Sequence, residues 1–455
     1  MQRQVAFLRP WLFVHYLCFW RWLSLQFRGA EPYGLLDMMN NMQIPRFSIG
    51  LGDRFGKEGL AQLRDVEKAS AAGMEVFPVW NKSNREHGLT GTQPSDTRRS
   101  AEQAVAQAGW RGGYMVDADH IGVANVDRFL KSCDFFTLDV AEPIGRPAPY
   151  SEKTRLLEAL SPWARRPWPD FGHDVAPGVA TLESFLQEYG AAVMEAGKIY
   201  RRILQERPGD TFVTEVSTDE ASEPQSPWVL FLLLGALSFE GVKVQTIAPK
   251  FTGHFHKGVD YRGNKQAFSK EFSQDLEAIR IAVREFQLPQ NLKISIHSGS
   301  DKFSLYPIIR EAVQKQHAGF HLKTAGTTWL EELVGLAEHG GEGLSLVKEI
   351  YRQAHHRRDE LMQPYASVVS IQAEKLPSPA TVEGWSGRQF VSALRHDPSQ
   401  SAFCPNFRQL LHLAFKIAAE MREPFFQALD QARELVEKNV TTNLWERHLR
   451  PLGVS

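Results

Sequence analysis

Eight short apolar runs, separated by longer stretches of helical pattern, constrain the fold of this 455-residue chain more than any other feature. Several runs are continuously apolar, as strands are when both faces of a sheet are covered. Strands that alternate with helices in this way predict an α/β fold, a (β/α)8 barrel of the TIM type. The runs span residues 46–53, 75–83, 113–121, 135–141, 210–217, 242–251, 293–300 and 320–327.

Three segments between the runs have the clearest helical character. Residues 58–72 and 270–286 repeat apolar side chains at helical spacing, which predicts amphipathic helices. Residues 226–239 are almost wholly apolar, and a helix of that composition is expected to be buried.

The spacing of these patterns predicts how the chain is divided. We expect an N-terminal apolar extension of unknown role at 1–43 and a catalytic barrel at 44–340. The barrel carries an insertion after the fourth strand, at about 142–209, where a lid or part of the substrate pocket often lies. Residues 341–455 are predicted to form a helical extension packed on the barrel.

Composition narrows the possible partners and location. A formal net charge of −1 gives no electrostatic reason to expect nucleic acid or an anionic membrane surface as a partner. Cys18, Cys133 and Cys404 show no pairing or zinc-type spacing, which favours a reducing, cytoplasmic compartment. The longest clean apolar run of the N-terminal segment, Trp11 to Trp20, is too short to span a bilayer, so no membrane association is expected.

Histidines gather where the predicted strands end, which is where a barrel builds its active site. His120, His254, His256 and His297 all follow or end apolar runs. In an extended chain, residues two apart face the same way, so His254 and His256 could share one ion or substrate. A catalytic metal needs about three protein ligands and an open position, and this set can supply them.

Carboxylates accompany the histidines. Asp119 is adjacent to His120 and would face the opposite way in a regular strand, so both enter one site only if the strand end bends. Glu215 lies inside an apolar run, where an unused carboxylate is costly. It therefore ranks above Asp219, for which a helix N-cap is an equally good interpretation.

Charged residues at other strand ends are candidates for binding substrate. Lys323 lies in the last predicted strand, Asp301 follows His297, and Lys82 and Arg85 could hold a carboxylate. The glycines of SIGLGDRFG loosely resemble a dinucleotide fingerprint. The acid expected at the end of the second strand is missing, so a nicotinamide site is not favoured.

Six longer motifs occur in a fixed order from about residue 44 onward. They are IGLGDRFG, PVWNKSNREHGLTGTQP, GYMVDADHI, DFFTLDVA, KFTGHFHKGVDY and ISIHSGSDKFSLYP. Together they resemble the tagaturonate epimerase family, which interconverts tagaturonate and fructuronate. The resemblance leaves residues 1–43 uncovered.

The resemblance implies a metal-dependent barrel enzyme with a sugar acid as substrate, and it is compatible with a homo-oligomer. The implied cofactor is a divalent cation such as Zn, Mn or Ni. Carried onto this chain, it implies metal ligands at His120, His256 and His297 and acid–base partners at Asp119 and Glu215. The remaining candidates are assigned to substrate binding: His254, Lys323, Lys82, Arg85 and Asp301.

Alternatives remain for both activity and mechanism. A ketohexose 4-epimerase acting on fructose and tagatose, another metal-dependent sugar isomerase or aldolase, and a sugar-binding barrel without catalysis are the competing interpretations. The two uronates differ at a carbinol carbon β to the ketone, whose hydrogen simple enolisation does not acidify. Inversion there requires retro-aldol cleavage and re-addition, transient oxidation by a nicotinamide, or direct deprotonation, and the weak glycine signal favours the first.

Overall fold

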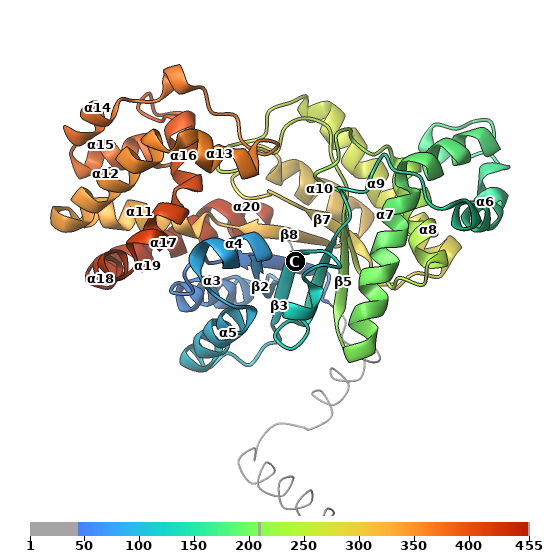
Figure 1. Cartoon of the computed structure of the whole chain (residues 1–455), viewed down its shortest axis with the longest axis horizontal. Coiled ribbons are helices and arrows are strands. Elements are labelled where there is room, and N and C mark those ends of the chain that lie inside the picture. Colours follow the sequence, from blue (N-terminus) through green and yellow to red (C-terminus); the bar gives the residue numbers. More distant parts are fainter. Residues whose placement is uncertain (1–43, 208–210, 454–455) are drawn as a thin grey trace, which may run out of the picture. The chain divides into compact units, whose positions relative to one another are not determined.

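The computed structural model describes residues 44–207 and 211–453. Eight parallel strands follow one another around a closed barrel, in which β8 pairs with β1 (Figure 1). The predicted fold class is therefore confirmed. The strands are β1 (Phe47–Gly52), β2 (Phe77–Ser83), β3 (Met115–Ile121), β4 (Phe135–Asp139), β5 (Val213–Ser217), β6 (Thr246–Ala248), β7 (Lys293–Ile296) and β8 (Phe320–Ala325).

Each predicted run contains one strand, although several strands end earlier than the apolar pattern does. The largest difference is at β6, which covers only Thr246–Ala248 of the run 242–251. Pro249 follows it directly, and a proline has no N–H with which to continue the ladder. The residues beyond β6 are therefore free to form a loop at the C-terminal face of the barrel.

Helices surround the barrel, and the three predicted from the sequence are present as α3, α8 and α9. α9 begins earlier than expected because the side chain of Asn264 caps it, accepting from the amides of Gln266 and Ala267. The helical segments up to β8 are α3 (Gly59–Ala71), α4 (Asn84–Thr90), α5 (Pro94–Ala108), η1 (Val126–Arg128), α6 (Tyr150–Ala164), η2 (Pro169–Phe171), α7 (Val179–Glu206), α8 (Pro227–Phe239), α9 (Lys265–Phe286) and α10 (Tyr306–Gln316).

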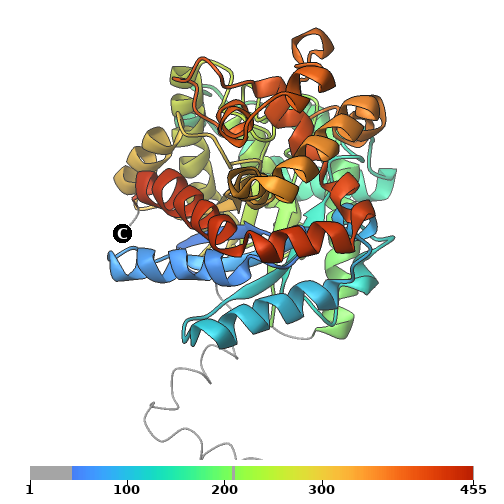
Figure 2. The same cartoon turned by 90° about the vertical axis from the view of Figure 1, so that its left-hand side faces the viewer.

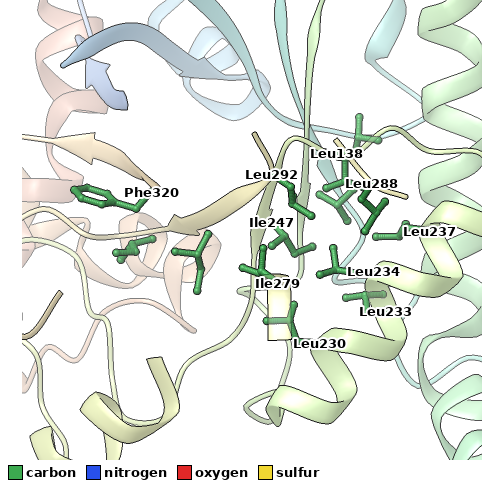
Figure 3. Packing of buried hydrophobic residues seen from close by; sticks show 14 of the residues in the cluster. Leu138, Leu230, Leu233, Leu234, Leu237, Ile247, Ile279, Leu288, Leu292 and Phe320 are labelled. Carbon is green, nitrogen blue, oxygen red and sulfur yellow. The ribbon is translucent and has the colours of Figure 1, made fainter. Parts of the chain in front are cut away.

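The apolar helix α8 is buried on nearly every side. Its leucines point toward Ile247 of the barrel wall (Figure 3), while α9, α7 and α6 cover its other faces. Leu230, Leu233, Leu234 and Leu237 are all fully buried. Burial of one such side chain contributes about 1.5–3 kcal/mol, which explains why this helix has no polar face.

The chain after β8 forms a second group of helices with its own hydrophobic core. Its members are α11 (Thr328–His339), α12 (Gly341–His356), α13 (Arg358–Met362), η3 (Gln363–Tyr365), η4 (Ala373–Lys375), α14 (Pro379–Glu383), α15 (Gly387–Leu394), α16 (Pro405–Leu413), α17 (Phe415–Met421), α18 (Glu423–Gln431), α19 (Arg433–Thr441), η5 (Thr442–Leu449) and α20 (Arg450–Leu452).

The end of the chain returns to the barrel. α19 and the π-helical η5 lie along α3 (Figure 2), and α20 contacts α10. Leu444, Leu449 and Leu452 join the hydrophobic core of the barrel. Because α11 leads away into the extension, η5 and α20 occupy the outer position between α10 and α3 that the eighth helix of a barrel usually fills.

Two other predictions concern segments outside the barrel wall. The N-terminal extension 1–43 lies outside the described residues. Among the helices that the structure does describe, none is long and apolar enough to cross a membrane. The described residues between β4 and β5 fold into α6, η2 and α7, and the insertion expected at about 142–209 stays a prediction.

Candidate active site

A cavity of about 300 Å³ opens at the C-terminal ends of the strands. Its wall combines strand-end residues with residues of the chain after β8, namely Trp329, Tyr365, Val368 and His412. None of its lining residues comes from the described part of the insertion after β4. The C-terminal extension therefore performs the pocket-forming role that the sequence pattern assigned to the insertion.

The end of β3 bends, and the bend places two adjacent side chains in the cavity. His120 has a left-handed backbone with φ of 51°, and the register between β3 and β4 shifts between Ala118 and Ile121. Asp119 and His120 consequently both line the cavity, as the site requires. A regular strand would have turned one of them away.

Three potential metal ligands converge on one side of this cavity. The ligand atoms of His120, Asp219 and His297 all lie within 4.8 Å of one another. Nδ1 of His297 is buried and lies 3.0 Å from Oδ1 of Asp219. Two of the three ligands predicted from the sequence are thus brought together, and the third member of the group is Asp219 rather than His256.

A second carboxylate lies behind each histidine of the group. Nδ1 of His120 is 3.3 Å from Oδ2 of Asp139, and Nε2 of His297 is 2.7 Å from Oε1 of Glu215. A carboxylate that binds one ring nitrogen fixes the tautomer and directs the other nitrogen outward. This arrangement leaves Nε2 of His120 and Nδ1 of His297 as the nitrogens directed toward Asp219.

The carboxylates strongly perturb both imidazoles. Burial lowers the pKa of His120, but the charges of Asp119 and Asp139 outweigh it and raise the pKa to about 10. Burial likewise lowers the pKa of His297, and Asp219 with Glu215 raises it to about 9. These carboxylates therefore favour additional positive charge between the two rings.

The residues fit a divalent metal ion on both charge and geometry. A divalent cation with two neutral imidazoles supplies the same positive charge as two protonated imidazoles. Ligands about 2.0–2.2 Å from one ion lie no more than about 4.4 Å apart, so a small adjustment of the 4.8 Å group would suffice. One carboxylate and two imidazoles are a donor set that Zn, Mn and Ni all accept.

Beneath the cavity, Lys323 neutralises a group of buried acids. Its Nζ lies 2.6 Å from Asp117, 3.1 Å from Asp119 and 2.9 Å from Glu215. Burial raises the pKa of Asp119, but Lys323 and the two histidines lower it to about 2. Asp119 is thus held ionised at the cavity wall.

Glu215 occupies a different position from Asp119. It is fully buried and does not line the cavity. Besides His297 and Lys323, its carboxylate accepts hydrogen bonds from Thr137 and Thr246. The structure places Glu215 behind His297, where it hydrogen-bonds to the imidazole and does not face the cavity.

Close packing of β1 against β8 positions Lys323. A Cβ on Gly50 would lie 2.6 Å from the backbone nitrogen of Thr324, so only glycine fits there. The register between these strands shifts beside Gly50, and Thr324 has a φ of 58°. The glycine of SIGLG that resembled a nucleotide fingerprint therefore has a packing role.

The GHFH histidines lie apart from the ligand group. The rings of His254 and His256 stack with centroids 5.2 Å apart, so they do share a face. His254 is exposed, and neither residue lines the cavity. The loop forms its own antiparallel bridge, in which the amide of His254 donates to Arg262, and this bridge separates the pair from the strand ends.

The remaining predicted substrate-binding residues divide into two groups. Arg85 and Lys323 line the cavity, whereas Lys82 and Asp301 do not. Nζ of Lys82 donates to the carbonyl of Arg54 beneath the β1 loop. Asp301 is fully buried, so we correct its assignment from substrate binding to structural pairing.

The carboxylate of Asp301 pairs with the guanidinium of Arg408. Arg408 is also fully buried and joins the extension to the barrel. Nη2 of Arg408 donates to Asp301 and to Thr327, while Nε donates to the carbonyl of Gly258. Burial raises the pKa of Asp301, but Arg408 and neighbouring histidines hold it well below its usual range. The carboxylate that the sequence analysis assigned to substrate binding is therefore paired with Arg408.

Sequence reasoning did not select three residues of the site. Asp139 is the last residue of β4 and lies within the fourth run, so its position among strand-end acids was a usable signal. Lys257 directly follows the GHFH motif and lines the cavity. His412 comes from α16 of the extension, and no local pattern connects that helix with the barrel rim.

Comparison with known proteins identifies the family. The model of the tagaturonate epimerase family matches residues 36–452. The chain belongs to this family. It is therefore an isomerase of the carbohydrate epimerase class, and the sugar-binding alternative without catalysis is set aside.

Individual relatives agree with this assignment over most of their length. The tagaturonate/fructuronate epimerase of Thermotoga maritima is 28% identical over 419 residues, covering 89% of this chain and 80% of that protein. A glycerol-complexed crystal structure of fructuronate-tagaturonate epimerase UxaE from Cohnella laeviribosi has a TM-score of 0.75 and 27% identity, and covers 91% of this chain and 83% of that one. The native crystal structure of that enzyme has the same TM-score and identity, with coverages of 92% and 84%.

Proposed function

We propose that this epimerase interconverts D-tagaturonate and D-fructuronate at the carbinol carbon β to the ketone, using a divalent metal ion. The observation that carries the metal is the convergence of His120, Asp219 and His297 within 4.8 Å at the rim of the barrel. The substrates follow from the family and from the names of the relatives. Zn, Mn and Ni are the candidate ions for such a donor set.

Retro-aldol chemistry inverts this carbon without removing its hydrogen. The carbinol hydroxyl loses its proton and becomes an aldehyde while the bond to the carbon beside the ketone breaks. The electron pair of that bond passes into an enediolate on the ketone fragment. The aldehyde turns, the bond forms again on its other face, and the new alkoxide takes up a proton.

A bound divalent cation would supply Lewis-acid stabilisation of the negative charge that develops on oxygen. The chain's own residues manage the protons and the orientation. Asp119, ionised beside Lys323, is the proposed acceptor of the hydroxyl proton in one epimer. Glu220 also lines the cavity and is the carboxylate we propose for the other epimer. Glu215 acts through His297 as a positioning residue.

The proposed activity is tested by incubating the purified protein with D-tagaturonate before and after treatment with a chelator. We expect D-fructuronate to form, activity to be lost with the metal, and activity to return when Zn, Mn or Ni is added. His297→Ala should behave like the chelated enzyme, and His339→Ala, on an exposed helix end, should match the parent. Full turnover by a protein shown to be metal-free would overturn the metal assignment, and no fructuronate at all would overturn the substrate.

Solvent deuterium tests the mechanism separately. In D2O, the retro-aldol route leaves the original hydrogen on the inverted carbon, because that C–H bond never breaks. Direct deprotonation would replace it with deuterium from solvent. Product isolated at partial conversion is therefore expected to carry hydrogen at that carbon by NMR, and deuterium there would refute retro-aldol cleavage.

A further inference from the structure

The cavity contains four long cationic side chains, and three of them already have partners. Arg54 forms an ion pair with Glu86, and Lys323 is surrounded by Asp117, Asp119 and Glu215. Arg85 donates to the carbonyl of Pro364 and lies against the ring of Tyr365. These cations are committed to holding the walls of the site together.

Lys257 differs from the other three. Within residues 44–207 and 211–453, its ammonium has neither an ion-pair partner nor a hydrogen-bond acceptor, although it lines the cavity. Burial and the charge of Arg54 lower the pKa of Lys257, while Asp119, Glu220 and Asp219 oppose that change. A partly buried ammonium without a counter-ion is costly, and an anion in the cavity would remove that cost.

The backbone of Lys257 is held from the side of the extension. Its amide donates to the carbonyl of Val368 at 2.8 Å, and its carbonyl accepts from Nε2 of Gln409 at 3.2 Å. These contacts fix where the side chain enters the cavity. A fixed attachment point reduces the entropy lost when the ammonium contacts a ligand.

A neutral donor lies next to it. His412 lines the cavity beside Gly258, and its Nδ1 is buried without a hydrogen-bond partner among residues 44–207 and 211–453. Burial and the charges of Arg54 and Lys257 hold the pKa of His412 well below its usual range, so the ring is neutral. A neutral imidazole can donate one hydrogen bond to a carboxylate that Lys257 attracts.

We propose that the ammonium of Lys257, with His412 beside it, receives the carboxylate of the sugar acid and makes the enzyme select uronates over neutral ketoses. This inference rests on the proposed function, because it assigns one end of the same substrate. The ketone and the inverted carbon then lie toward His120, Asp219 and His297, and the carboxylate lies toward the extension. A neutral ketohexose would leave Lys257 without a counter-ion, which penalises its binding.

The test compares Lys257→Met on an acidic and on a neutral substrate. For D-tagaturonate we expect kcat/KM to fall roughly 10- to 100-fold, mainly through KM, as the loss of one charged hydrogen bond implies. For D-tagatose the change should stay below about threefold. Lys250→Met is the matched control, because Lys250 follows the same strand but does not line the cavity. Lys257→Arg, which keeps the charge, should restore part of the preference.

Direct binding separates this inference from the proposed reaction. D-Galactonate, an unreactive sugar acid, should bind the parent more tightly than galactitol does, and Lys257→Met should remove the difference while metal content and melting temperature stay unchanged. That result would support the carboxylate site even if the parent showed no epimerase activity. Equal losses for acidic and neutral ligands, or no loss for either in a folded Lys257→Met protein, would overturn it.

Discussion

Replacement of Glu215 by glutamine tests whether the buried carboxylate supports the metal through His297. Oε1 of Glu215 accepts hydrogen bonds from His297, Lys323 and Thr137, while Oε2 accepts one from the hydroxyl of Thr246. A glutamine can place its oxygen at the first position and its NH2 toward Thr246, whose hydroxyl can turn to accept. The substitution therefore removes the charge and preserves the hydrogen bonds.

The loss of that charge should weaken the metal site by a definable amount. A carboxylate that orients and polarises a histidine ligand is typically worth 10- to 100-fold in metal affinity, or about 1.4–2.7 kcal/mol. Competition with a chromophoric chelator measures the dissociation constant for Zn. We expect the constant of Glu215→Gln to rise within that range, with the secondary structure retained by circular dichroism.

Glu271→Gln provides the control for replacing a partly buried carboxylate elsewhere. Glu271 accepts from the amide and the hydroxyl of Thr252 and does not line the cavity. It should lose some stability but keep the metal affinity of the parent. If Glu215→Gln binds Zn within twofold of the parent, the carboxylate behind His297 does not support a metal ligand and the site must be assigned differently.

Further predictions address the ligands, the extension and the barrel wall. Asp219→Asn should leave the purified protein substoichiometric in metal by elemental analysis, whereas His256→Ala should retain the metal content of the parent; the reverse pattern would restore His256 as the ligand. Arg408→Met strands the buried carboxylate of Asp301 and should cost about 3–5 kcal/mol in urea unfolding, so a loss below about 1 kcal/mol would contradict the pairing. Gly50→Ala forces a Cβ against β8 and should destabilise by about 1–3 kcal/mol and reduce turnover, and an unchanged melting temperature would refute the close approach.

The barrel could be predicted from the sequence because its signal is local. Each strand of 44–325 lies within its own apolar run, and α3 and α9 were predicted from the periodicity of their own segments and α8 from its apolar composition. The position of η5 and α20 against the barrel could not be predicted from a local pattern of this kind. The sequence predicts a helical extension packed on the barrel, but only the three-dimensional path of the chain shows that η5 and α20 fill the gap between α10 and α3.

The candidate ligands were only partly predictable because facing arguments hold only inside regular strands. His254 and His256 share a face as their spacing implied, yet Gly253 has a φ of 83° and the loop pairs with Arg262. The turn at Gly253 therefore directs both imidazoles away from the C-terminal ends of the strands. For Asp219 the sequence analysis gave an N-cap equal weight with a role in the site. The N-cap interpretation fails because α8 begins only at Pro227 and is capped by Ser226.

The same limitation explains where the site is strained. His120, Ser298 and Thr324 are non-glycine residues with left-handed backbones, and all three line the cavity. Each is a proposed ligand or directly follows a site residue, His297 or Lys323. Such conformations cost of order 1–3 kcal/mol each and persist only where the surrounding structure enforces them. A prediction from sequence assumes that side chains alternate regularly along a strand. That alternation is interrupted at the residues whose left-handed backbone directs side chains into the cavity, so the backbone strain lies where the site needs it.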